Sequence, residues 1–409
     1  MNKLNAIVGQ SGGPTAAINA TLSGVIKGVL QNKEKISKIY GMTNGIKGLL
    51  REDITDLTEI FSDDHNLKLL CQTPSAYLGS CRFKLTEDDD IKKVFEIFEK
   101  YNIGYFFYIG GNDSMDTVMK LSKSQYNNGV KIIGVPKTID NDLALTDHCP
   151  GFGSSAKYIA TTVSEVARDT HCYDIKSVTI IEIMGRNAGW LTASASLSRV
   201  NGGHAPDLIY LPERTFDKDK FINDVKNKLD IHKNVVIAIS EGIKTADGKY
   251  VAASDNLLKE DQFGHSQLGG AGKVLELLIA EELKVKVRSI ELNTPQRCAS
   301  HIVSAIDIEQ SIAIGAEAVN CAINGESGKM MIYNRISSRP YKFEIKSADI
   351  NNIANEEKTV PDIFITNDGS DVTPLFTDYA LPLIQGEFEI EYSNGLPKHI
   401  VYNSKEAHN

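Results

Sequence analysis

Val135-Pro-Lys-Thr-Ile-Asp-Asn-Asp142 places charged and polar side chains directly after a short apolar run, Ile132–Val135. An apolar run of this length, bounded by glycine or proline, is typical of a strand buried inside a parallel sheet. In such sheets, ligands collect at the carboxyl ends of the strands. The octapeptide therefore predicts a parallel α/β layer and indicates where its functional site lies.

The side chains of this octapeptide suit phosphoryl transfer onto an alcohol. That reaction needs a base for the hydroxyl, a metal ligand, and a cation that offsets the charge developing on the phosphate. Asp140, Asp142 and Lys137 are of these types, and Thr138 stands among them. A plain polar turn is the simpler interpretation, but it leaves the density of charge unexplained.

Outward from this strand, short apolar runs alternate with longer helical stretches over most of the chain. Strands are predicted at Leu4–Val8, Tyr105–Ile109, Ile132–Val135, Val178–Ile183, Leu208–Leu211, Val235–Ile239, Val285–Leu292, Met330–Tyr333 and Phe388–Tyr392. Helices are predicted at Pro14–Leu30, Ser114–Leu121, Ser154–Asp169, Ala188–Leu197, Asp217–Leu229 and Leu268–Leu283. This alternation predicts an α/β fold, and a chain of 409 residues is long enough for two packed lobes.

Two further turns combine adjacent glycines with the start of a helix. Gly9-Gln-Ser-Gly-Gly-Pro-Thr15 follows the first predicted strand, and Tyr108-Ile-Gly-Gly-Asn-Asp-Ser-Met-Asp116 follows the second. Adjacent glycines let the backbone approach an anion, and a helix N-terminus offers it free N–H groups. Asn112 and Asp113 either cap the second helix or hold Mg²⁺ against phosphate. Neither turn has the spacing of a dinucleotide-binding fingerprint or a P-loop.

Arginines and one acidic residue stand in or just after the later predicted strands. Met184-Gly-Arg186 and Ser240-Glu-Gly242 follow two of them, and Pro295-Gln-Arg297 follows a third, which contains Arg288. A guanidinium binds phosphate through two parallel hydrogen bonds, and a carboxylate such as Glu241 accepts hydrogen bonds from sugar hydroxyls. A single arginine is more often part of a surface ion pair, so their joint occurrence is the informative observation.

The overall composition argues against several classes of protein. Hydrophobic residues make up 42% and charged residues 24%, and the formal net charge of −9 disfavours a general binder of nucleic acid or of acidic membranes. No apolar run approaches the roughly 18 residues of a membrane span. The six cysteines form no CxxC pair and the N-terminus has no signal-peptide pattern, which together predict a cytoplasmic location.

Taken in order, these motifs resemble those of the phosphofructokinase family. The resemblance runs from Gly12-Gly13 to about Arg297 and rests on six separate motifs. It implies two similar Rossmann-like three-layer α/β lobes with mainly parallel sheets and an active site in the cleft between them. Residues 1–153 and about 288–345 are expected to form the donor-binding lobe, and residues 154–287 and 346–409 the fructose-phosphate-binding lobe. The segment after Lys329 is interpreted as additional packing.

The resemblance also implies a role for each motif residue. Asp140 is expected to be the base for the 1-hydroxyl of fructose 6-phosphate, with Lys137, Thr138 and Arg186 at the transferred phosphoryl group. The sugar phosphate is expected at Met184, Gly185, Glu241, Arg288 and Arg297, with one of these arginines reaching in from a neighbouring subunit of a homodimer or homotetramer. The phosphoryl donor is expected at Gly13, Arg82, Gly111 and Asp113, and Mg²⁺ at Asn112, Asp113 and Asp142.

Two positions favour pyrophosphate over ATP as the donor. Family members that use ATP typically have glycine at the positions of Asp113 and Lys137, whereas pyrophosphate users have an aspartate and a lysine there. A carboxylate at 113 opposes the charge of a nucleotide's α-phosphate, and an ammonium at 137 neutralises phosphate charge. An ATP-dependent phosphofructokinase is the alternative enzyme.

Asn112 departs from the family pattern, which has an acidic residue at this position. An amide oxygen can ligate Mg²⁺ but adds no charge, so a non-catalytic subunit that binds sugar phosphate is an alternative of another class. The presence of Asp140, Asp142, Lys137 and Arg186 argues against that alternative. We expect a reversible glycolytic phosphotransferase with no nucleic-acid or membrane partner.

Overall fold

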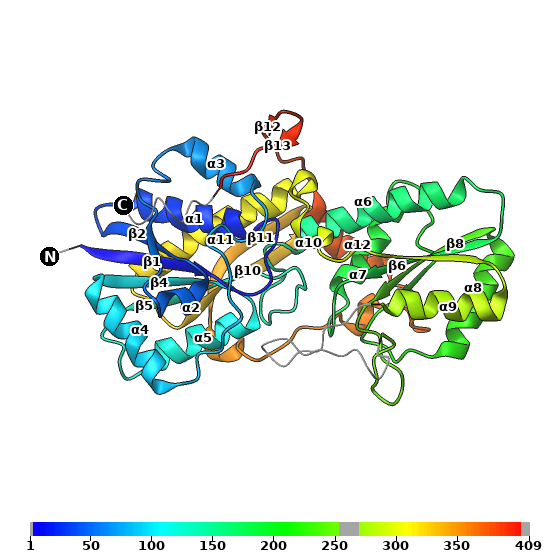
Figure 1. The fold of residues 1–409 in the computed structure, drawn as a ribbon, viewed down its shortest axis with the longest axis horizontal. Coiled ribbons are helices and arrows are strands. Elements are labelled where there is room, and N and C mark those ends of the chain that lie inside the picture. Colours follow the sequence, from blue (N-terminus) through cyan, green and yellow to red (C-terminus); the bar gives the residue numbers. More distant parts are fainter. Residues whose placement is uncertain (1–2, 253–269, 402–409) are drawn as a thin grey trace.

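The computed structural model describes residues 3–252 and 270–401, which form two lobes lying end to end along the long axis of the molecule (Figure 1). Each lobe has a central sheet with helices on both faces, as the α/β pattern of the sequence predicts. Within these residues, no helix is long and apolar enough to cross a membrane.

The first lobe is built on a seven-stranded sheet. Its strands lie in the order β11 (Tyr341–Asp349), β10 (Lys329–Ser338), β5 (Lys131–Pro136), β4 (Ile103–Gly110), β1 (Leu4–Gln10), β2 (Ile36–Met42) and β3 (Ile54–Asp56). The central strands run parallel, whereas β11 and β3 pair antiparallel with their neighbours. The ends of β1, β4 and β5 therefore lie side by side at one edge of the sheet.

Helices cover both faces of this sheet because successive side chains of each strand point to opposite sides. One face packs against α1 (Ile18–Gln31), α3 (Asp64–Gln72) and α11 (Ala305–Ile323). The other packs against α2 (Gly45–Leu49), α4 (Asp88–Lys100) and α5 (Asn112–Lys123). Helices α1 and α11 cross at glycines: a Cβ on Gly24 would lie 2.0 Å from Ile312 O, and one on Gly315 would lie 2.2 Å from Thr21 O.

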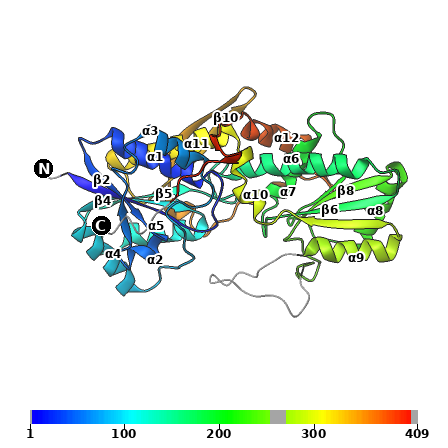
Figure 2. The ribbon, with the colours of Figure 1, turned by 45° about the horizontal axis from the view of Figure 1, so that its top comes forward.

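The second lobe has a fully parallel four-stranded sheet in the order β7 (Leu208–Tyr210), β8 (Asn234–Ser240), β6 (Ser177–Ile183) and β9 (Lys286–Glu291). One face is covered by α6 (Phe152–His171), α7 (Trp190–Ser194) and α12 (Pro374–Ala380). The other is covered by α8 (Lys218–Ile231) and α9 (Ala271–Leu283). Helix α6 runs from the junction of the lobes along the second lobe (Figure 2).

Predicted elements that follow a strong apolar pattern occur in the structure with shifted ends, and one prediction is wrong. Helix α9 begins at Ala271, and the first two residues of the helix predicted at 268–283 lie outside the described residues. No strand spans Phe388–Tyr392. The main-chain N–H and carbonyl of Glu391 instead bond to the side chain of Gln72, at 3.0 and 3.1 Å.

The division of the chain between the lobes differs from the expected one. Strand β9 pairs with β6, so residues 288–291 lie in the second sheet rather than in the donor-binding lobe. Strand β11 extends the first sheet to Asp349, and residues 350–354 continue into the first-lobe core. Within the C-terminal segment, residues 360–383 pack in the second lobe, and residues 391–400 return to the first through Gln72.

Candidate functional site

A pocket of about 520 Å³ is lined by turns that follow strands of both sheets. The first lobe contributes the turns after β1, β4 and β5, and the second those after β6 and β8. Because parallel strands end at the same edge of a sheet, residues far apart in sequence converge there. The predicted residues in the pocket wall are Gly13, Arg82, Gly111, Asn112, Asp113, Lys137, Thr138, Asp140, Asp142, Met184, Arg186, Glu241 and Arg297.

The side chain of Lys137 is buried against the first glycine turn. Its Nζ donates to Gly13 O at 2.6 Å, and its main-chain N–H donates to Gly110 O at 3.0 Å. Burial lowers the pKa of Lys137 to about 8, although the charges of Asp140 and Asp142 oppose that shift. The ammonium is therefore still largely protonated at neutral pH and presents a positive charge to an anion at the glycine turns.

Asp140 lines the same pocket from the loop after β5. Its main-chain N–H donates to Thr138 Oγ1 at 3.1 Å, which fixes a tight turn. Burial raises the pKa of the Asp140 carboxyl, and the charges of Lys137 and Arg186 oppose that shift. A carboxylate of raised proton affinity beside two cations is suited to take a proton from a hydroxyl.

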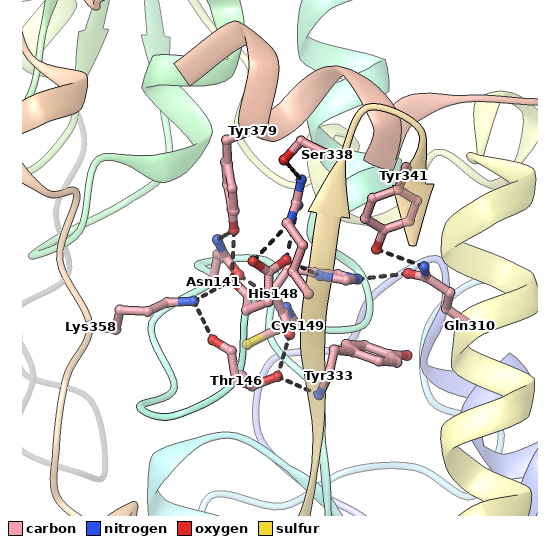
Figure 3. A network of polar contacts seen from close by, with 12 residues as sticks. Asn141, Thr146, His148, Cys149, Gln310, Tyr333, Ser338, Tyr341, Lys358 and Tyr379 are labelled. Atoms are coloured by element: carbon pink, nitrogen blue, oxygen red, sulfur yellow. Dashed lines mark hydrogen bonds and ion pairs between the residues drawn. The ribbon is translucent and has the colours of Figure 1, made fainter. Parts of the chain in front are cut away.

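Asn141 holds the turn between the two aspartates of the octapeptide. It is fully buried and has a φ of 55°, in the left-handed region that asparagine tolerates. Its Nδ2 donates to the Tyr379 hydroxyl at 2.9 Å, and its Oδ1 accepts the main-chain N–H of Cys149 at 3.0 Å (Figure 3). These bonds point Asn141 away from the pocket, so its neighbours Asp140 and Asp142 are directed into it.

An ion pair behind the pocket supports this turn. Arg335 of β10 donates to both oxygens of Asp147 at 2.9 Å, and its guanidinium lies between the rings of Tyr341 and Tyr379. Burial by itself raises the pKa of Asp147, but the His148 and Arg335 hydrogen bonds outweigh it and lower the pKa to about 2. The hairpin of β10 and β11 thus braces the segment that carries the predicted catalytic residues (Figure 3).

Two oxygen atoms in the pocket suit a hard cation. Asn112 Oδ1 and Asp142 Oδ1 are both buried, and neither has a hydrogen-bond partner within residues 3–252 and 270–401. Burial, followed by the charges of Asp140 and Glu357, raises the pKa of Asp142 to about 7. Mg²⁺ commonly binds one or two protein carboxylates together with phosphate oxygens and water. These residues therefore fit a metal that arrives with a phosphate ligand.

The second lobe contributes Glu241 and Arg186 to the pocket. Glu241 Oε1 accepts the main-chain N–H of Gly185 at 3.3 Å, which places Gly185 directly behind the pocket wall. Burial raises the pKa of Glu241 to about 7. A Cβ on Gly242 would lie 1.8 Å from Arg186 O, so only glycine permits the two turns to pack this closely. This close packing sets Glu241 and Arg186 in one wall.

Arg297 reaches the pocket from the short helix α10 (Pro295–Cys298). Gln296 ties this helix to the end of β6, because its Oε1 accepts the main-chain N–H of Met184 at 3.1 Å. Arg297 Nη1 lies 3.5 Å from the position that a Cβ on Gly13 would occupy. Its Nε is buried and, among the residues described, has no hydrogen-bond partner. The guanidinium therefore extends to the first glycine turn.

Arg288 is the predicted residue that the fold does not bring to the pocket. It lies on β9, is partly exposed, and places its Nη1 3.5 Å from Asp169 Oδ2. Within one chain, Arg288 therefore has no access to the pocket that Arg297 lines.

Sequence reasoning missed Asn355 and Glu357, which line the pocket from the segment after β11. The sequence predicts only additional packing for this segment. It has no apolar periodicity, and the residues beside which it lies are about 200 positions earlier in the chain, as in the bridge between Glu357 and Leu143. No local signal in the sequence could have placed it in the site.

Similarity to known proteins extends over both lobes. The family model described as phosphofructokinase matches residues 5–322. The pyrophosphate–fructose 6-phosphate 1-phosphotransferase of Halomonas elongata is 40% identical over 406 residues, which are 97% of this chain and 96% of the relative. That of Xanthomonas campestris is 41% identical over 409 residues, 98% of this chain and 96% of the relative. The solved pyrophosphate-dependent phosphofructokinase of Nitrosospira multiformis superposes with a TM-score of 0.87 at 37% identity, covering 98% of this chain and 96% of that one.

Proposed function

This chain belongs to the phosphofructokinase family, and we propose that it transfers a phosphoryl group from pyrophosphate to the 1-hydroxyl of fructose 6-phosphate. The products are fructose 1,6-bisphosphate and phosphate, and the reaction runs in either direction in cytoplasmic glycolysis. Relatives at 40% and 41% identity over nearly the whole chain carry the name of this activity.

The observation that carries the choice of donor is the position of Lys137. Its ammonium is buried at the first glycine turn, 2.6 Å from Gly13 O, where a phosphate group would approach the backbone. A fixed cation there stabilises the compact charge of a diphosphate. Asp113, at the start of α5, adds a carboxylate in the same wall, which disfavours the α-phosphate of a nucleotide. Gly13, Gly111, Arg82 and Asp113 form the donor side.

Asp140 takes the proton from the 1-hydroxyl as that oxygen bonds to the transferred phosphorus. The raised pKa of Asp140 makes its carboxylate a stronger base than an exposed aspartate. Lys137, Thr138 and Arg186 face the transferred group and offset the charge on its oxygens. Asn112, Asp113 and Asp142 are the residues that would hold Mg²⁺, which neutralises phosphate charge when bound.

The sugar phosphate lies toward the second lobe. Glu241, with Met184 and Gly185, holds the fructose hydroxyls. Arg297 is the proposed ligand of the 6-phosphate, and because its guanidinium lies at the first glycine turn, this role requires the side chain to turn toward the second lobe. We include Arg288 as a group supplied to the pocket of a neighbouring subunit, in a homodimer or homotetramer, because it lies on the exposed side of β9. Its guanidinium, which among the described residues is held only by the 3.5 Å contact with Asp169 on this sheet edge, is suited to bind a phosphate across an interface.

Exchanging the two donor-selecting side chains tests the proposal. The variant Asp113→Gly with Lys137→Gly removes the carboxylate and the ammonium, and we expect the ratio of kcat/KM for ATP to that for pyrophosphate to rise at least about tenfold. The control is Asp116→Asn with Lys120→Gln, an ion pair of 2.7 Å on the same helix outside the pocket. If the double variant has no measurable turnover, calorimetric titration with ATP still measures its affinity for the nucleotide. A variant that binds ATP no better than the parent refutes this assignment of donor choice.

A further inference from the structure

Glu357 is an acidic residue in the pocket to which the proposed mechanism gives no role. It lies in the pocket wall together with Asn112, Asp113, Asp140 and Asp142, and its side chain is exposed. Within residues 3–252 and 270–401, its carboxylate makes no hydrogen bond or ion pair. It is therefore free to act on whatever the pocket binds.

The backbone holds Glu357 firmly at this position. Glu357 forms an antiparallel bridge with Leu143, and the main-chain N–H of Lys358 donates to Asp142 O at 2.7 Å. The Lys358 ammonium is turned away from the pocket and donates to the carbonyls of Thr146 and Asp147, both at 2.9 Å (Figure 3). Lys358, the residue after Glu357, thus fixes this segment to the loop after β5, which carries the predicted catalytic groups.

The side chain of Asn112 bonds to the backbone of the segment that carries Glu357. Its Nδ2 donates to the main-chain carbonyl of Glu356 at 2.9 Å, so its Oδ1 is turned away from that carbonyl and is left without a hydrogen-bond partner in the described residues. An aspartate at 112 would place a carboxylate oxygen against the Glu356 carbonyl, and two acceptors in contact repel. The segment that brings Glu357 into the pocket therefore favours a neutral amide at 112.

We propose that Glu357 supplies to the metal end of the pocket the negative charge that Asn112 does not, so that Asp113, Asp142 and Glu357 together attract a metal–diphosphate complex. This inference rests on the proposed function. No three His, Cys, Asp or Glu side chains in the described residues are placed to hold an ion directly. Glu357 thus acts through the water shell that Mg²⁺ retains, as a charge rather than a ligand.

Electrostatic coupling within the pocket agrees with this assignment. The charge of Glu357 contributes to raising the pKa of both Asp140 and Asp142, after the larger effect of burial. A carboxylate that acts on both aspartates also acts on a divalent cation held between them and the donor. The charge of Glu357 has opposite effects on two kinds of ligand, because it attracts the cation of a metal complex and repels an anion without a metal.

The test uses Glu357→Gln, which removes the charge and keeps the size. Its matched control is Glu356→Gln, because the Glu356 side chain does not line the pocket. One probe is the preformed complex of Mn²⁺ with methylenediphosphonate, followed by solvent-proton relaxation, and the other is metal-free methylenediphosphonate, followed by calorimetry. We expect Glu357→Gln to weaken binding of the manganese complex about five- to tenfold, with metal-free binding unchanged or tighter. Glu356→Gln is expected to stay within about twofold of the parent for both probes.

Two results would overturn the inference. One is an unchanged affinity of Glu357→Gln for the manganese complex. The other is a parallel loss for both probes, which a structural defect would cause. A parent protein that binds neither probe contradicts the proposed pyrophosphate-dependent function itself, whereas a parent that binds both, with no effect of Glu357→Gln, contradicts only the role of Glu357.

Discussion

Replacing Glu241 by glutamine is expected to change how the affinity for fructose 6-phosphate depends on pH. Glu241 sits in the wall of the second lobe, and burial raises its pKa from 4.5 to about 7. A carboxylate with this pKa is roughly one-tenth ionised at pH 6 and roughly nine-tenths ionised at pH 8. If the ionised form holds the fructose hydroxyls, the KM for fructose 6-phosphate falls by about tenfold over this range relative to the glutamine variant.

The same substitution is expected to stabilise the protein at alkaline pH. The folded protein raises the pKa of Glu241, so the folded state favours the protonated carboxyl. Ionisation of Glu241 therefore lowers the free energy of unfolding. This loss of stability is absent below pH 4.5 and complete above about pH 7. A rise of that size corresponds to at most about 3 kcal/mol. Glu241→Gln is therefore expected to melt at a higher temperature than the parent at pH 8 and not at pH 4.5.

Initial rates at saturating pyrophosphate, measured from pH 6 to pH 8, give the KM of both proteins. The ratio of the parent's KM to that of Glu241→Gln cancels the titration of the sugar phosphate itself, because both proteins bind the same substrate. A ratio that stays flat across this range refutes the assignment of Glu241 to the sugar hydroxyls.

Three further substitutions test other parts of the structure. Asp140→Asn is expected to lower kcat by about 10²- to 10⁴-fold with little change in binding of fructose 6-phosphate; near-normal turnover in stopped assays would exclude Asp140 as the base. Arg335→Met removes the 2.9 Å ion pair of Asp147 and leaves its hydrogen bond to His148, a loss of about 1–3 kcal/mol; differential scanning calorimetry at pH 7 should show a lower unfolding temperature, and an unchanged one would mean that the pair is not stabilising. Gly24→Val drives a side chain into Ile312 O, 2.0 Å from the ideal Cβ, and is expected to yield little folded protein; a normally folded variant would show that α1 and α11 can separate.

The site was predictable where chemistry follows a strand directly. The octapeptide at 135–142, the two glycine turns and Met184-Gly-Arg186 all follow buried apolar strands, and parallel topology brings the ends of the strands to one edge of each sheet. The pocket forms where those edges of the two sheets face each other. The residue types then indicate phosphate chemistry. For this part of the site, local pattern and global fold point to the same answer.

Contacts between distant segments were not predictable. Glu357 enters the pocket because its segment pairs with Leu143, and nothing near residue 357 in the sequence indicates that partner. The apolar pattern of residues 286–291 predicts a strand but does not indicate that β9 pairs with β6 of the second sheet. In Phe388–Tyr392, the main chain of Glu391 bonds to the side chain of Gln72 and not to a neighbouring strand, a long-range contact that the alternating apolar pattern does not indicate.

A coupled assay of the purified chain, supplied with Mg²⁺, fructose 6-phosphate and either pyrophosphate or ATP, tests the central claim most directly. The position of Lys137 at Gly13 predicts rapid formation of fructose 1,6-bisphosphate with pyrophosphate and a kcat/KM for ATP lower by at least about tenfold. Efficient turnover with ATP, together with no reaction with pyrophosphate, would contradict it.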